Sequence, residues 1–125
     1  INWRLLEALP DPDLRSGDSL AQRLTEALRA PSELFSADND LADAILASMV
    51  ARDPDIKRLR DAIGSELLRR LELAAGPGHD PQLVWAALML YSGAMVQAGM
   101  GYFSFDEVVT QVASLLARWE AADPG

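Results

Sequence analysis

The most apolar part of the chain lies between residues 80 and 119, where the spacing of apolar positions predicts two consecutive helices. Within positions 83–98 of the first helix, only Tyr91, Ser92 and Gln97 are hydrophilic. A helix that is apolar on all sides is one that is covered on all sides. We therefore expect other helices to pack around this pair.

Local signals mark where the two helices begin. Asp80 followed by Pro81 predicts the first start, because aspartate accepts from free amides of the first turn and proline suits the first helical position. The second helix opens with a Ser-x-x-Glu capping box, formed by Ser104 and Glu107. Its apolar positions then follow helical spacing: Phe105, Val108, Val109, Val112, Leu115, Leu116 and Trp119.

The first of these helices carries two opposite faces. One consists mostly of small residues, which let another helix approach closely: Ala87, Tyr91, Ala94, Ala98 and Gly101. The other lies about 180° around the helix: Trp85, Met89, Ser92, Val96 and Gly99. One face could meet a second pair of helices and the other an internal cavity. The alternative, that both faces are ordinary core, stays open.

The chain before this pair predicts four more helices and no strand. They are expected at Ile1–Leu9, from a cap at Asp18 or Ser19 to Ala30, at Leu41–Arg52, and at Asp55–Ala75. Pro31 is expected to end the second of them, because proline lacks an amide. The sequence therefore predicts an all-α fold, a bundle of about six helices in a single domain spanning residues 1–125.

The helix at Asp55–Ala75 is expected to be amphipathic. Its buried side carries five apolar residues: Ile56, Leu59, Ile63, Leu67 and Leu71. Its basic residues could be taken for a positively charged surface patch: Lys57, Arg58, Arg60, Arg69 and Arg70. Acids alternate with them at i,i+4 spacing, as in Lys57 with Asp61 and Glu66 with Arg70, so we interpret this side as a solvated face.

Composition bounds the function further. The 19 acidic and 11 basic residues give a formal net charge of −8, which disfavours nucleic-acid binding by this part, since phosphate contacts need a basic face. Without cysteine, the chain has no disulfides or thiolate metal sites, and a reducing, cytoplasmic location is compatible. A membrane span is not expected at residues 81–99, which are rich in glycine and alanine and lack basic anchors.

Catalytic chemistry is disfavoured by the same sequence. Nucleophilic catalysis needs a serine or cysteine beside a positioned base, and the single histidine, His79, lies in a Gly-Pro-Gly loop. Aspartates stand at helix starts, where capping explains them: Asp18, Asp40, Asp53, Asp80 and Asp106. We expect no enzyme, no metal and no cofactor. A small hydrolase or transferase that uses these acids is a remote alternative.

An apolar ligand pocket is the remaining candidate site. Aromatic and thioether side chains with one hydroxyl group suit such a cavity. The candidate ligand-binding residues are Phe35, Met49, Trp85, Met89, Ser92 and Val96.

From Ser19 onward the chain resembles the C-terminal effector-binding and dimerisation domain of TetR-family transcriptional regulators. Three stretches carry the resemblance: LADAILASMVARDPDIKRLRDAIGSELLRRLELA, DPQLVWAALMLYSGAMVQAGMG and SFDEVVTQVASLLARW. The chain begins with Ile1 and not with methionine, and we expect Ile1–Leu9 to be the tail of a helix that links to a preceding helix-turn-helix domain.

The resemblance implies a set of roles. The last two helices would pair with their copies in a homodimer as a four-helix bundle. A small hydrophobic effector would bind among the preceding helices, near Trp85, Met89 and Ser92, and would control operator DNA binding by the N-terminal domains of a repressor. The implied dimer interface contains Ala87, Tyr91, Ala94, Ala98, Val108, Val112, Leu115 and Leu116. The alternative is a stand-alone helical protein–protein interaction module.

Overall fold

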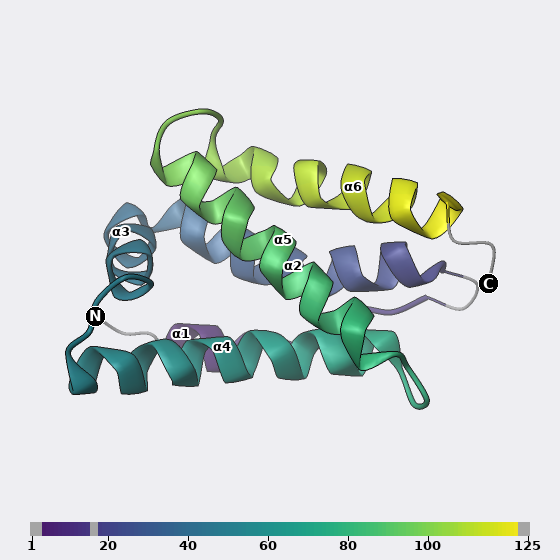
Figure 1. Cartoon of the computed structure of the whole chain (residues 1–125), viewed down its shortest axis with the longest axis horizontal. Coiled ribbons are helices and arrows are strands. Elements are labelled where there is room, and N and C mark those ends of the chain that lie inside the picture. Colours follow the sequence, from purple (N-terminus) through teal and green to yellow (C-terminus); the bar gives the residue numbers. More distant parts are fainter. Residues whose placement is uncertain (1–3, 16–17, 123–125) are drawn as a thin grey trace.

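The computed structural model describes residues 4–15 and 18–122, and in these ranges all regular structure is helical. The elements are α1 (Arg4–Glu7), α2 (Leu20–Ala37), α3 (Asn39–Ser48), α4 (Pro54–Ala75), α5 (Pro81–Gly99) and α6 (Val108–Ala122), with a 3-10 turn at Phe105–Glu107 before α6 (Figure 1). The predicted all-α class with six helices is confirmed.

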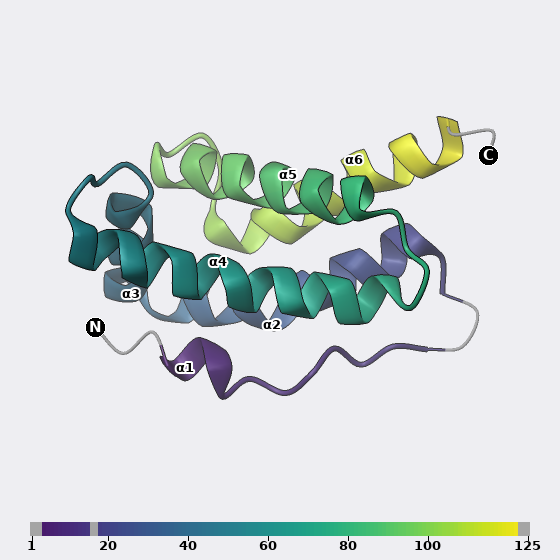
Figure 2. The ribbon, with the colours of Figure 1, turned by 60° about the horizontal axis from the view of Figure 1, so that its bottom comes forward.

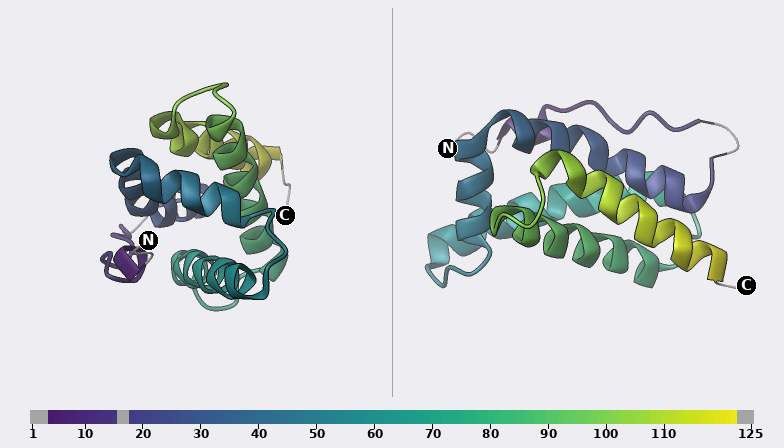
Figure 3. Two further views of the ribbon diagram at one scale, coloured as in Figure 1. Left: turned by 90° about the vertical axis from the view of Figure 1, so that its left-hand side faces the viewer. Right: turned by 90° about the horizontal axis from the view of Figure 1, so that it is seen from above.

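Four long helices, α2, α4, α5 and α6, form a ring in which each packs against two others. Helix α2 contacts α4 and α6, and α5 contacts the same two helices. The shorter α3 lies across one end of the ring and touches α2, α4 and α5 (Figure 3). The inward sides of these helices form the core, in which Leu28, Leu71, Ala87 and Val108 are completely covered.

The segment before α2 runs along the outside of the ring (Figure 2). Helix α1 packs on α4. The chain then passes α4 in an extended form, and there Arg69 donates to a carboxylate oxygen of Asp11 at 3.3 Å. Of the helix predicted at Ile1–Leu9, the structure shows α1 alone, and Ile1–Trp3 lie outside the described residues.

Some of the capping residues named from the sequence do start helices, as Ser19, Asp53 and Asp80 show, but α3 is capped by Asp38 and not by Asp40. Ser19 opens α2: its Oγ accepts from the Gln22 amide at 3.1 Å, and the Gln22 side chain accepts from the Ser19 amide at 2.7 Å. Asp80 opens α5 by accepting from the Gln82 amide at 2.9 Å. Helix starts were therefore predictable from residues within one turn.

Helix α2 does not end at Ala30 as predicted, but continues through Pro31 to Ala37. A proline inside a helix leaves the carbonyl four residues earlier without its amide donor. Here that carbonyl belongs to Ala27, and Arg70 of α4 donates to it through Nε at 3.2 Å. A tertiary hydrogen bond thus replaces the missing helical one, and the helix continues.

The same contact corrects the prediction that Arg70 lies on a solvated face. Arg70 is only 1% exposed, and burial lowers the pKa of its guanidinium from the usual value. Glu66, predicted to pair with Arg70, pairs with Arg69 at 2.8 Å. The predicted surface pair of Lys57 and Asp61 is present, at 2.8 Å.

Helix α3 ends at Ser48, earlier than the predicted end at Arg52. The last carbonyls of a helix need partners from outside it. Arg60 of α4 supplies one for the last residue of α3, because its Nη1 donates to the carbonyl of Ser48 at 3.0 Å, and it also donates to the carbonyl of Ala51 in the following turn at 2.8 Å. The arginine therefore holds the chain in a turn where local spacing predicts more helix.

Candidate functional site

An apolar pocket of about 330 Å³ lies among helices α2 to α5, at the end of the bundle that α3 covers. Small-molecule sites in proteins are typically roughly 300–1,000 Å³ in volume. Its walls are formed by Phe35, Ile45, Ser48, Met49, Arg60, Ile63, Gly64, Leu67, Leu88, Tyr91, Ser92 and Met95.

Helices α4 and α5 line the pocket with the same i, i+3, i+4, i+7 spacing, which keeps side chains on one face of a helix. The residues from α4 are Arg60, Ile63, Gly64 and Leu67. Those from α5 are Leu88, Tyr91, Ser92 and Met95. Gly64 widens the pocket, because a Cβ added there would meet no atom within 4 Å.

Two polar groups of the pocket wall are already paired within the protein. The hydroxyls of Tyr91 and Ser32 form a buried hydrogen bond of 2.9 Å. Burial raises the pKa of Tyr91, so its hydroxyl stays neutral. Ser48 donates its hydroxyl to the carbonyl of Ile45 at 2.6 Å. These hydroxyls already form hydrogen bonds within the protein, so they are not available to a ligand.

Two other polar groups of the wall remain available. Ser92 makes no side-chain hydrogen bond to any residue that the structure describes. Arg60 directs Nη1 at two carbonyls, which leaves the guanidinium edge formed by Nε and Nη2 without a partner among the described residues. Within residues 4–15 and 18–122, no acidic side chain lines the pocket. The available chemistry is therefore one cation and one hydroxyl in an apolar wall.

Tyr91→Phe is expected to lower the free energy of unfolding by about 1–2 kcal/mol, because it leaves the buried Ser32 hydroxyl unpaired. Removing both partners, in Ser32→Ala with Tyr91→Phe, should recover most of this loss, since neither polar atom is then buried alone. Urea unfolding of the native chain, both single variants and the double variant measures the coupling. Losses that simply add would contradict the pairing.

The structure separates the residues predicted to bind a ligand into two groups. Three line the pocket: Phe35, Met49 and Ser92. Three lie on the outside of α5 and are exposed: Trp85, Met89 and Val96. The reason is the rotation of α5 about its axis, which points Tyr91 into the core and leaves Ser92 at the edge of the buried side.

Most residues predicted at a dimer interface lie in the core of this chain. Six are buried there: Ala87, Tyr91, Ala98, Val108, Val112 and Leu116. Ala94 is partly buried, and Leu115 is half exposed. The small residues of α5 do permit close helix packing, but in this structure α5 packs against α3, α4 and α6 of the same chain.

Exposed apolar side chains gather on the outer side of the α5–α6 pair. We call this surface the outer face, and it consists of Trp85, Met89, Val96, Met100, Leu115 and Trp119. Leu115 lies roughly 160° around α6 from Ala113 and Ala117, which border α2, whereas the partly exposed Trp119 also lines a small hollow beside Leu20 and Leu24 of α2. Helix α5 contains no charged residue. Even so, none of the helices in the described ranges is both long enough and apolar enough to cross a lipid bilayer. An uncharged apolar patch of this kind is typical of protein contacts.

Arg60 is the pocket residue whose role the sequence interpretation missed. That interpretation places it on a solvated face, whereas the structure half-buries it in the pocket wall. Its spacing carried the signal, because Arg60 stands three and seven residues before Ile63 and Leu67, both predicted to be buried. Tyr91 was also missed as a pocket residue, because it was predicted at the dimer interface. The remaining missed residues are apolar or small and carry no comparable signal: Ile45, Ser48, Ile63, Gly64, Leu67, Leu88 and Met95.

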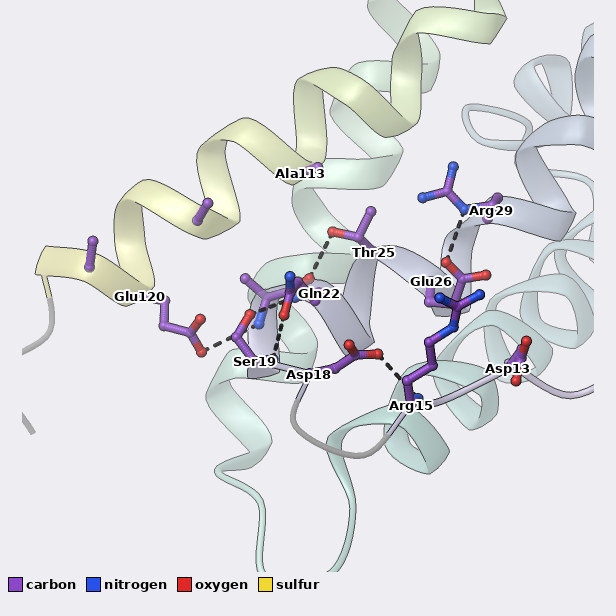
Figure 4. A pocket seen from close by; sticks show the side chains of 13 residues that line it. Asp13, Arg15, Asp18, Ser19, Gln22, Thr25, Glu26, Arg29, Ala113 and Glu120 are labelled. Atoms are coloured by element: carbon purple, nitrogen blue, oxygen red, sulfur yellow. Dashed lines mark hydrogen bonds and ion pairs between the residues drawn. The ribbon is translucent and has the colours of Figure 1, made fainter.

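A wider hollow of about 810 Å³ lies between α2 and α6 (Figure 4). Its charged groups are largely engaged with one another or with a helix end. Arg29 donates to Glu26 at 3.0 Å, and Glu120 accepts from the Ala21 amide at the start of α2 at 3.3 Å. Within the described residues, no three His, Cys, Asp or Glu side chains are grouped to hold a metal ion. This hollow is explained as the seam between two helices.

Comparison with known proteins relates the chain to regulators of transcription. No protein-family model and no solved structure matches it. Over 92 residues it is 36% identical to three proteins named uncharacterized HTH-type transcriptional regulators: Rv0767c and MT0791 of Mycobacterium tuberculosis and Mb0790c of Mycobacterium bovis. The match covers 72% of this chain and 43% of each relative. The chain thus spans less than half the length of the transcriptional regulators to which it is similar.

Proposed function

We propose that this chain is the effector-binding and dimerisation domain of a TetR-like transcriptional repressor. The observation that carries the proposal is the apolar pocket among α2 to α5, in a chain similar to HTH-type transcriptional regulators. Aromatic, aliphatic and thioether walls suit a small hydrophobic effector.

The outer face supports dimerisation. In a two-fold symmetric dimer the same patch of each subunit meets its copy, so both patches are covered at once. The net charge of −8 makes two copies repel each other, except where they meet through uncharged surface. The α5–α6 pairs of two subunits would then form a four-helix bundle through their outer sides, with Trp85, Met89 and Leu115 between them.

Regulation would follow from a shift in population. In this proposal, operator DNA is bound by helix-turn-helix domains outside the present sequence. An effector that prefers the DNA-incompetent arrangement lowers operator affinity by the ratio of its two affinities. Helix α4 connects the two ends of this system: it lines the pocket with Ile63 and Leu67, and it holds the N-terminal segment through Arg69 and Asp11.

Gly64→Leu tests the pocket. The added side chain projects into open space, so it should block binding of the neutral apolar dye N-phenyl-1-naphthylamine without disturbing α4, in which leucine is a good helix former. Ser65→Leu, at the next and exposed position, is the matched control and should bind the dye like the native chain. Fluorescence titration measures both affinities. Equal affinities in the two variants would show that apolar ligands do not use this pocket.

A stand-alone interaction module is the second candidate, because the outer face could also dock a different protein. Native mass spectrometry of the purified chain distinguishes the two functions. A dimer supports the regulator domain, and a monomer favours the interaction module.

A further inference from the structure

We infer that the pocket takes an amphiphilic monocarboxylate, with the carboxylate on Arg60 and the hydrocarbon part among the apolar side chains. This inference rests on the proposed ligand-binding function and names the class of the effector. Of the residues that the structure describes, Arg60 is the single cation in the wall, and none of the others in the wall is an acid. A half-buried guanidinium has lost part of its hydration, so a ligand of opposite charge gains more from this position than a neutral one.

The hydrogen bonds of Arg60 prepare it for a carboxylate. Its Nη1 group is held by the backbone carbonyls of Ser48 and Ala51, at 3.0 and 2.8 Å. Both bonds fix the plane of the guanidinium at the end of α3 and leave the edge of Nε and Nη2 unused. Two parallel N–H groups on one edge match the two oxygens of a carboxylate.

The acids nearest to Arg60 form their ion pairs with other cations, although the pKa of Asp61 is lowered by its hydrogen bond from Lys57 and, more weakly, by the charge of Arg60. Asp61, the next residue, is exposed and accepts from Lys57 Nζ at 2.8 Å. Asp55 is paired with Arg58 on the surface. In the part of the chain that the structure describes, these acids have cationic partners of their own, and Arg60 forms no ion pair.

The size and shape of the pocket limit the hydrocarbon part. At about 30 Å³ for each nonhydrogen atom, the space of one water in the liquid, the 330 Å³ volume holds roughly eleven such atoms. This corresponds to an acid of about the size of decanoate. Met49 and Met95 in the wall are unbranched and flexible, so they can adapt to a linear chain or to a ring.

Competition between decanoate and 1-decanol for the dye N-phenyl-1-naphthylamine tests this inference, because the two compounds differ only in the head group. We expect the native chain to bind decanoate roughly tenfold or more tightly than 1-decanol, as for a hydrogen bond to a charged group. Arg60→Gln should remove this preference, and Arg60→Lys, which keeps the charge without the fork, should retain part of it. Arg58→Gln, at an exposed position on the same helix, should leave both affinities unchanged.

The outcomes separate the class of the effector from the existence of the pocket. If the dye binds, but 1-decanol competes as well as decanoate, the carboxylate assignment is overturned while the proposed pocket stands. The same holds if Arg60→Gln keeps the native preference. If the dye does not bind to the native chain at all, the pocket and the carboxylate assignment fall together. Should Arg60→Gln fail to fold, the preference of the native chain and of Arg60→Lys decides.

Discussion

Met89→Glu is expected to convert a dimer of this chain into monomers. Met89 is 65% exposed and lies between Trp85 and Val96 on the uncharged side of α5. In a symmetric contact the substitution would bury two unpaired carboxylates, one from each subunit. Each costs roughly 2–5 kcal/mol when it is desolvated without a partner. The dissociation constant should therefore rise by about a thousandfold or more.

Leu73→Glu is the matched control for this substitution. Leu73 is also an exposed apolar residue of a helix, but it lies on α4, away from the outer face. Native mass spectrometry and analytical ultracentrifugation should show a dimer for the native chain and for Leu73→Glu, and a monomer for Met89→Glu. A dimer that survives in Met89→Glu would mean that the subunits meet through another surface.

Pro31→Ala is expected to raise the free energy of unfolding by about 1–2 kcal/mol. The substitution supplies the backbone amide that the carbonyl of Ala27 lacks, and it removes a proline from a helix interior, where proline costs about 3 kcal/mol. The gain is smaller than this full cost for two reasons: Arg70 already donates to that carbonyl, and the buried proline ring loses its packing contacts.

Arg70→Met should reveal the dependence of the two positions on each other. In the native background it is expected to lower the free energy of unfolding by about 1–3 kcal/mol, because the buried Ala27 carbonyl loses its donor. In the Pro31→Ala background the loss should be much smaller, since the new backbone amide serves that carbonyl. Urea unfolding of the four proteins gives the coupling energy.

Arg69→Met is the control for this cycle, because Arg69 is exposed on the same helix and bonds to Glu66 and Asp11 and not to α2. It should show no coupling with Pro31→Ala. If Arg70→Met had the same effect in both backgrounds, Arg70 would contribute by packing alone, and the continuation of α2 through the proline would need another explanation.

The all-α class and the helix starts could be predicted because the signals are local. Capping acts within one turn, as between Ser19 and Gln22. The ends of α2 and α3 could not be predicted in the same way. Each depends on an arginine of α4, Arg70 for the first and Arg60 for the second. These arginines lie 43 and 12 positions from the carbonyls that they serve, beyond the single turn over which capping acts.

The candidate site was predictable only in part. The spacing of residues shows which side chains share a face of α5, but it does not show which face meets the core and which meets solvent. The helix has no charged residue to mark the side that meets solvent. Tyr91 faces inward, where its hydroxyl pairs at 2.9 Å with that of Ser32 on α2, a helix far away along the sequence. This contact fixes the rotation that places Ser92 at the pocket and Met89 on the outer face.

The bond from Arg70 to the carbonyl freed by Pro31 has a consequence for how homologous sequences vary. A proline in the middle of a helix is tolerated where another element donates a hydrogen bond to the carbonyl that the proline leaves unpaired. A buried arginine is tolerated where an acceptor lies within hydrogen-bond distance. Loss of the arginine alone would weaken the protein, whereas loss of the proline would not, because the new backbone amide serves the same carbonyl. Substitutions are therefore expected in one order: an apolar side chain at the second position should occur in homologues that already lack proline at the first.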